Sequence, residues 1–221
     1  MTSAPLAVRS EVMSTIVHLV RHGEVHNPDR ILYGRLPGWH LSVRGRQMAA
    51  AVAQDFADHD IRALVASPLQ RAQETAAPIL DGLNAAGAGL DLVTDEDLLE
   101  AGNDLQGLHI KGVRSALWNP KRWPMLRQPS VPSWGEPYTE IVDRMWLAID
   151  RARVAALSHE AVCVSHQLPV VCVQRDVQGL PLQHNPANRR CNLASVTSLV
   201  FDGPGDTELT DMIYSEPAQE I

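Results

Sequence analysis

Short apolar segments alternate along this chain with segments of helical character, and this alternation restricts the fold more than any other feature. The apolar runs are brief and rich in β-branched residues, as buried strands are. The expected strands are Thr15–Val20, Arg62–Ala66, Leu90–Val93, Ala161–Val164, Val196–Phe201 and Glu208–Tyr214. The expected helices are Arg46–His59 with Ser42 as its cap, the segment from Ser67 to Ala86, Pro137–Leu157 and Leu168–Gln178. The order predicts an α/β fold, a three-layer α/β/α sandwich around a mostly parallel central sheet.

The length of 221 residues and the absence of internal repeats favour a single domain, which we place at residues 14–214. Residues 1–13 show no periodicity and are expected to form a flexible N-terminal extension. Residues 113–135 are rich in tryptophan and proline, which predicts a cap-like insertion because the segment is long for a plain connection. Residues 215–221 are expected to form a polar C-terminal tail.

Composition narrows the class of protein and its surroundings. The formal net charge of -7 argues against a nucleic-acid or anionic-membrane surface. No apolar run approaches the roughly 18 residues of a membrane span. The three cysteines contain no C-x-x-C pair, which fits thiols in a reducing cytoplasm. We therefore expect a cytoplasmic protein with no nucleic-acid or membrane partner, and the sequence leaves a homodimer open.

Three of the expected strands end in polar residues of similar chemistry. Arg21 and His22 follow the first strand, Ser67 with Arg71 one turn later follows the second, and Ser165-His166 follows a third. The carboxyl ends of parallel strands share one edge of a sheet, where ligands bind in α/β folds. Two arginines, two histidines and a helix N-terminus at that edge predict a phosphate pocket.

Phosphoryl chemistry in such a pocket needs two further properties. One histidine must be neutral to attack phosphorus, and a cationic surround lowers its pKa and so favours that form. A carboxylic acid must protonate the leaving oxygen. From spacing alone this acid could be Glu24, Glu74, Glu96 or Glu100.

Four motifs in order resemble those of the histidine phosphatase superfamily, which has the phosphoglycerate mutase-like fold. The first is L-V-R-H-G-E at Leu19–Glu24, and the second is S-P-L-Q-R-A-Q-E-T-A at Ser67–Ala76. Leu98-Leu99-Glu100 resembles the segment that carries the family's proton donor, and Ser165-His166 resembles the third motif. The resemblance covers about Ile16 to Phe201.

The resemblance implies a role for each matching residue. His22 would be the phosphorylated nucleophile and Glu100 the proton donor, while Arg21, Arg71 and His166 would bind the phosphoryl group; no metal or cofactor is implied. Asn27 is a further substrate-binding candidate, although it stands one position earlier than the family's asparagine.

These residues predict a metal-independent phosphatase of the histidine acid phosphatase type that acts on a small phosphorylated metabolite. A cofactor-dependent phosphoglycerate mutase is the first alternative, and a non-catalytic binder of phosphorylated ligands on the same fold is the second. His18, His22 and His26 recur every four residues, but this spacing aligns metal ligands only on a helix, and the segment is expected to be a strand and a turn.

Overall fold

The computed structural model of the protein describes residues 14–109, 120 and 135–221. The N-terminal extension expected at residues 1–13 and most of the insertion expected at residues 113–135 therefore lie outside the described residues. The elements in chain order are β1 (Thr15–Arg21), α1 (Val43–Asp55), β2 (Ile61–Ala66), α2 (Gln70–Ala85), β3 (Leu92–Thr94), the 3-10 helix η1 (Glu96–Leu98), α3 (Tyr138–Ala155), β4 (Glu160–Ser165), α4 (Gln167–Val177), the 3-10 helix η4 (Pro186–Asn188), β5 (Val196–Asp202) and β6 (Glu208–Ser215). No helix among the described ranges combines the length and apolar character needed to cross a membrane.

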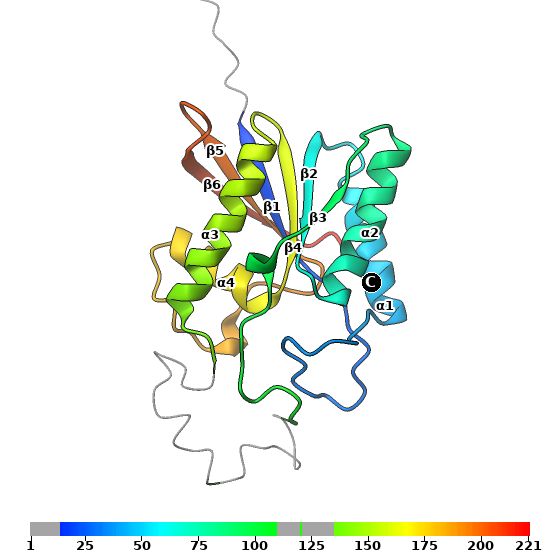
Figure 1. Ribbon diagram of the computed structural model, residues 1–221, viewed down its shortest axis with the longest axis vertical. Helices are drawn as coiled ribbons and strands as arrows, with labels where there is room; N and C mark the ends of the chain where they lie inside the picture. Colours follow the sequence, from blue (N-terminus) through cyan, green and yellow to red (C-terminus); the bar gives the residue numbers. More distant parts are fainter. Residues whose placement is uncertain (1–13, 110–119, 121–134) are drawn as a thin grey trace, which may run out of the picture.

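A six-stranded sheet in the order β3-β2-β4-β1-β5-β6 forms the middle layer (Figure 1). β1, β2, β3 and β4 are parallel to one another, while β5 runs antiparallel to β1 and to β6. Helices α1 and α2 cover one face of the sheet, and α3 and α4 cover the other. The predicted three-layer α/β/α sandwich with a mostly parallel sheet is confirmed.

Alternation along the central strands sends side chains into two separate cores. Val17 and Leu19 of β1 pack with α3 and α4, whereas Val20 packs with α1 and α2. Both faces of β1 and β4 are therefore apolar, as expected for strands covered by helices on both sides. The terminal segment also joins a core, because Ala218 is buried against the α1 and α2 face.

The sequence prediction for the start of the second helix is wrong by a few residues. Ser67 was expected to cap it, but α2 begins at Gln70 and its cap position is Leu69. The Ser67 hydroxyl instead lies 2.8 Å from Nε2 of His166. It therefore takes part in a tertiary contact and does not cap the helix. The predicted cap of α1 is confirmed, since Ser42 accepts a hydrogen bond from the backbone N–H of Gly45.

The loop after β1 lies directly against the first turn of α1. A Cβ on Gly45 would stand 2.0 Å from the carbonyl oxygen of Glu24, and a Cβ on Gly23 would stand 2.5 Å from the carbonyl oxygen of Gly45. That Glu24 carbonyl also accepts a hydrogen bond from the backbone of Ser42 at 2.8 Å. The two glycines therefore allow a backbone contact that fixes the loop carrying the site.

We expect Gly45→Ala to lower the free energy of unfolding by about 1–3 kcal/mol, because the added methyl group overlaps a fixed carbonyl. Gly82→Ala is the matched control: Gly82 is also helical and has open space around its missing Cβ. That control should stabilise the protein by about 0.5–1 kcal/mol through helix propensity. Urea unfolding of both variants measures the difference, and equal effects would contradict the assigned contact.

Candidate active site

The imidazole of His22 is buried and held in one tautomer. Its Nδ1 lies 2.7 Å from the carbonyl oxygen of Gly23, and a carbonyl can only accept, so Nδ1 carries the proton. Nε2 is therefore unprotonated, and its lone pair accepts a hydrogen bond from Nε of Arg71 at 3.2 Å. Burial lowers the pKa of His22 well below its ordinary value, and the cations of Arg71 and Arg21 lower it further. A neutral imidazole with an aimed lone pair is what a nitrogen nucleophile needs.

The guanidinium of Arg71 is fully buried in the first turn of α2. Besides His22, it contacts the carbonyl oxygen of Gly34 through Nη2 at 2.8 Å, and its Cζ lies 4.7 Å above the ring of Tyr33. Tyr33 stacks on Trp39 with ring centroids 5.2 Å apart. The Tyr33 ring therefore lies beside both Arg71 and His22, with Trp39 stacked on it.

His166 follows β4 and stands at the cap position of α4. Its ring centroid lies 5.1 Å from that of His22, and its Nε2 contacts the hydroxyl of Ser67 at 2.8 Å. Burial lowers the pKa of His166 well below its ordinary value, with Arg71 as the next cause. Three strand ends and two helix N-termini therefore meet at one edge of the sheet.

Within the described part of the chain, three buried side-chain nitrogens lack a hydrogen-bond partner. They are Nε of Arg21, Nη1 of Arg71 and Nδ1 of His166. Buried polar groups in proteins are nearly always paired, so unpaired ones call for a specific explanation. All three belong to the residues that the sequence selected for phosphate, and an oxyanion among them would accept their hydrogen bonds.

Glu100 lies in the segment after η1, on the same side of the sheet. Burial is the largest influence on the pKa of Arg71 and lowers it, while the Glu100 carboxylate is the next largest and raises it, as a nearby negative charge does to a cation. Two of its sequence rivals are engaged elsewhere. Glu24 accepts hydrogen bonds from Ser42 and Arg44, and Glu74 accepts one from the backbone of Leu41.

The side-chain amide of Asn27 forms hydrogen bonds within its own loop. Its amide donates to the carbonyl of Ile31 at 2.8 Å and accepts from the N–H of Ile31 at 3.0 Å. Both ends of the amide are therefore hydrogen-bonded within this loop. Its part in substrate binding stays a prediction.

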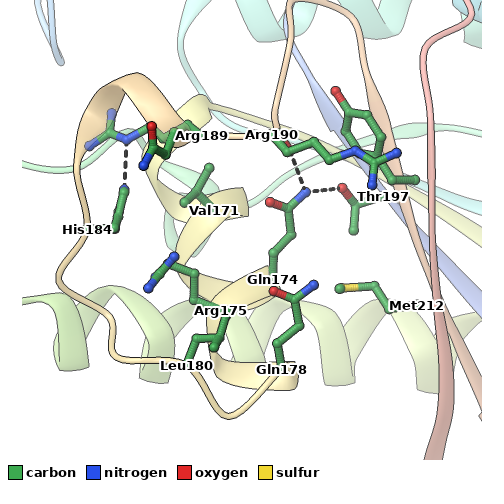
Figure 2. A pocket seen from close by; sticks show the side chains of 12 residues that line it. Val171, Gln174, Arg175, Gln178, Leu180, His184, Arg189, Arg190, Thr197 and Met212 are labelled. Atoms are coloured by element: carbon green, nitrogen blue, oxygen red, sulfur yellow. Dashed lines mark hydrogen bonds between the residues drawn. The ribbon is translucent and has the colours of Figure 1, made fainter.

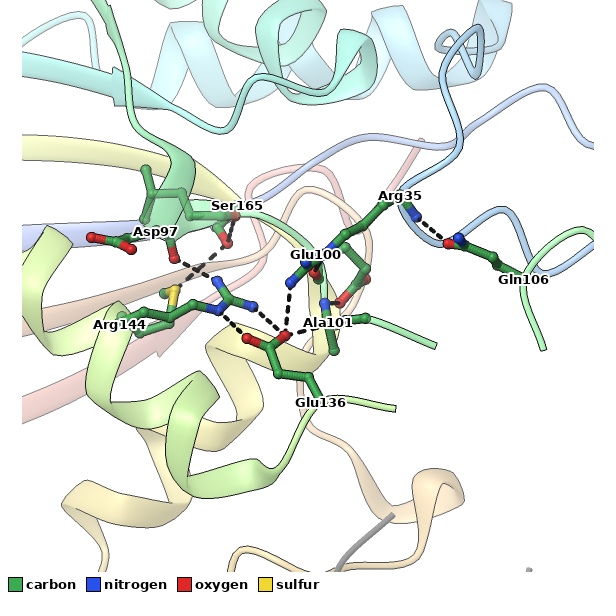
Figure 3. Close-up of polar contacts among 11 residues, drawn as sticks. Arg35, Asp97, Glu100, Ala101, Gln106, Glu136, Arg144 and Ser165 are labelled. Carbon is green, nitrogen blue, oxygen red and sulfur yellow. Dashed lines mark hydrogen bonds and ion pairs between the residues drawn. The ribbon is translucent and has the colours of Figure 1, made fainter. Parts of the chain in front are cut away.

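The sequence predicted no role for Glu136, although Gly135-Glu136-Pro137 resembles the family's Gly-Glu-Ser with Pro in place of Ser; its carboxylate lies at the centre of a network beside Glu100 (Figure 3). One carboxylate oxygen accepts from Arg144 Nε at 2.7 Å, and the other accepts from Arg35 Nη2 at 2.7 Å and from the backbone of Gly102 at 3.1 Å. Arg35 also donates through Nε to the carbonyl of Glu100 at 2.6 Å. Burial raises the pKa of Glu136, but these donors outweigh it and hold that pKa below its ordinary value. The network fixes the backbone of Glu100.

A separate cavity of about 350 Å³ lies between α4, the segment around η4 and the last two strands (Figure 2). Gln174 on its wall donates to the carbonyl of Arg190 and to the hydroxyl of Thr197. Arg189, also on its wall, contacts Gln167 at 3.4 Å, and Gln167 directly follows His166. The cavity thus adjoins the site, but its lining contains neither His22 nor Arg71.

The sequence pattern of the histidine phosphatase superfamily (branch 1) matches residues 17–211, so the chain belongs to this family. The chain is 54% identical over 204 residues to "Uncharacterized protein Rv0525" of Mycobacterium tuberculosis, a match that covers 92% of this chain and 97% of that protein. It is 29% identical to "Probable phosphoglycerate mutase GpmB" of Yersinia enterocolitica, covering 89% of this chain and 95% of the relative.

Solved structures with the same fold include phosphatases. YhfR of Bacillus stearothermophilus superposes with a TM-score of 0.71 at 23% identity, covering 89% of this chain and 95% of YhfR. The mycobacterial glucosyl-3-phosphoglycerate phosphatase Rv2419c superposes with a TM-score of 0.70 at 24% identity, covering 92% of this chain and 98% of that protein. These likenesses confirm the phosphoglycerate mutase-like fold.

The two buried histidines should make stability depend on pH. The lowered pKa values of His22 and His166 mean that the unfolded chain takes up protons below about pH 6.5 while the folded chain does not. Stability is therefore complete at neutral pH and falls as the pH drops, with a slope approaching about 1.4 kcal/mol per pH unit for each histidine.

Urea unfolding from about pH 7.5 to about pH 5 in phosphate-free buffer measures this slope. His166→Gln, which removes one titrating group, should reduce the slope by about half. The exposed His26 provides the control, because His26→Ala changes a side chain open to water in both states. An unchanged slope in the His166 variant would contradict the assignment.

Proposed function

We propose that this protein is a metal-independent phosphatase that hydrolyses a small phosphorylated metabolite through a phosphohistidine on His22. The observation that carries the proposal is the buried His22 tautomer, with its Nε2 lone pair directed toward Arg71. The partnerless nitrogens of Arg21, Arg71 and His166 support it, because they are donors suited to the oxygens of a phosphoryl group.

The proposed reaction has two balanced steps. In the first, Nε2 of His22 attacks phosphorus, the bond to the leaving oxygen breaks, and the Glu100 carboxylic acid gives that oxygen a proton. In the second, the Glu100 carboxylate takes a proton from water, the water oxygen attacks phosphorus, and the phosphorus–nitrogen bond breaks. Arg21, Arg71 and His166 stabilise the oxygens in both transition states.

Other contacts help to keep this geometry ready. The Ser67 hydroxyl can donate its proton to Nε2 of His166, which leaves Nδ1 as the donor toward phosphate. The Thr75 hydroxyl donates to the carbonyl of Arg71 and accepts from the backbone of Gly23, so it ties α2 to the nucleophile loop. The substrate alcohol would lie beside Tyr33 and Trp39.

A cofactor-dependent phosphoglycerate mutase remains the second candidate, favoured by the similarity to GpmB of Yersinia enterocolitica. A coupled assay that converts 3-phosphoglycerate to 2-phosphoglycerate separates the two activities. A non-catalytic binder on the same fold would hydrolyse neither p-nitrophenyl phosphate nor any member of a panel of phosphorylated metabolites. The same panel would identify the substrate.

His22→Ala should reduce the hydrolysis of p-nitrophenyl phosphate by at least about 1,000-fold, because no other group supplies the nucleophile. His26→Ala is the control, since His26 lies four residues further along the same loop and is exposed. Steady-state kinetics and circular dichroism of both variants are the measurements. Turnover retained by a folded His22 variant would refute the proposed intermediate.

Glu136→Gln should lower kcat about tenfold with a smaller change in KM, because it loosens the backbone that positions Glu100 without removing a group that contacts phosphate. Glu140→Gln is the matched control, since Glu140 is exposed in the first turn of α3. If the two variants have the same kinetics, Glu136 has no positioning role.

A further inference from the structure

A second cluster of histidines lies away from the candidate active site. His18, in the middle of β1, Glu160, at the start of β4, and His59, between α1 and β2, place one ligand atom each within 4.8 Å of one another. His18 and His22 are four positions apart, which corresponds to about 13 Å of extended chain. The cluster therefore belongs to the end of the sheet where β1 and β4 begin, the upper edge in Figure 1.

We propose that His18, His59 and Glu160 form a binding site for a divalent transition-metal ion, with Zn²⁺ as the best fit. Two imidazole nitrogens and one carboxylate oxygen are a donor set that zinc uses when a fourth position stays open to water. Magnesium and calcium prefer sites made of oxygen atoms only, so the two histidines select against them.

The distances suit a small ion after a slight opening of the cluster. One oxygen of Glu160 lies 2.8 Å from His18 Nε2 and 2.6 Å from His59 Nδ1. Ligands at about 2.0–2.1 Å from a tetrahedral zinc stand roughly 3.3 Å apart. Both of these distances would have to lengthen by roughly 0.5–0.7 Å for coordination, and the two imidazole nitrogens, which lie within 4.8 Å of each other, would take two further positions around the ion.

The surroundings hold the ligands as an outer shell would. His18 Nδ1 lies 2.8 Å from the hydroxyl of Ser198, which can accept the Nδ1 proton and so leave Nε2 free for the metal. Phe56 packs its ring edge-on against both histidines, with centroids 5.0 Å from His18 and 5.3 Å from His59. The backbone of Glu160 donates to the carbonyl of Asp60 at 3.1 Å, which fixes the loop of His59 to β4.

The three side chains of the cluster differ in their exposure to solvent. The side chain of His18 is 5% exposed, that of Glu160 20% and that of His59 37%. The site therefore has a closed base inside the sheet and an open side at His59, where an ion can enter and retain water. Arg62, three residues after His59, pairs with Asp60 at 2.8 Å, which offsets its charge.

The experiment is Zn²⁺ binding by isothermal titration calorimetry to chelator-treated protein, with thermal unfolding at about 100 μM Zn²⁺ as a second readout. We expect one high-affinity zinc per chain and a higher Tm with zinc. His59→Ala should weaken binding by at least about tenfold, and Glu160→Gln should do so as well. Failure of the wild-type protein to bind zinc would overturn the proposal.

His159→Ala is a closely matched control. His159 is 35% exposed and contacts a carboxylate, Asp60, at 2.7 Å, but it is not a member of the cluster. This variant should bind zinc as the wild-type protein does. Undiminished binding in His59→Ala would locate the metal elsewhere, for example at His22 and His166, and would overturn the assignment of the site. The phosphatase assay is not a readout here, so this result is independent of the proposed function.

Discussion

The hydrogen bond between Arg71 and His22 is the interaction on which the rest of the site depends. It joins two buried groups of which one is charged, and burying a charge is costly without further partners. The carbonyl of Gly23 orients the imidazole, and the carbonyl of Gly34 and the ring of Tyr33 hold the guanidinium. Strand β1, helix α2 and the loop after β1 must therefore all be in place before the His22 ring is held in this orientation.

The same arrangement explains why the site lies at this edge of the sheet. A parallel sheet brings the ends of β1, β2 and β4 together, and α2 and α4 begin just beyond them. Their free backbone N–H groups add positive potential to that of the arginines. Burial and this positive potential both lower the pKa of His22 and of His166, so both rings are neutral at physiological pH.

Local sequence patterns predicted the elements well and predicted tertiary contacts poorly. The strand that ends just before His22 and the cap at Ser42 follow from apolar runs and from side-chain chemistry near in sequence. The start of α2 could not be predicted, because His166, about a hundred residues away, contacts the Ser67 hydroxyl. Glu136 lies in a segment that resembles a family motif, but its role could not be predicted, because two of its partners, Arg35 and Gly102, lie far from it in sequence. Glu100 was selected from its rivals by resemblance, not by spacing.

The network around Glu136 also bears on how this protein could change over evolution. Asn103 and Gly135 form an antiparallel bridge, and the backbone of Glu136 donates to the carbonyl of Gly102 at 3.0 Å. The backbone beside Glu100 is therefore fastened to the backbone that leads into α3. A substitution that disturbs this bridge would displace the proposed acid without touching the residues at the strand ends. The position of the acid can thus be altered independently of the oxyanion pocket.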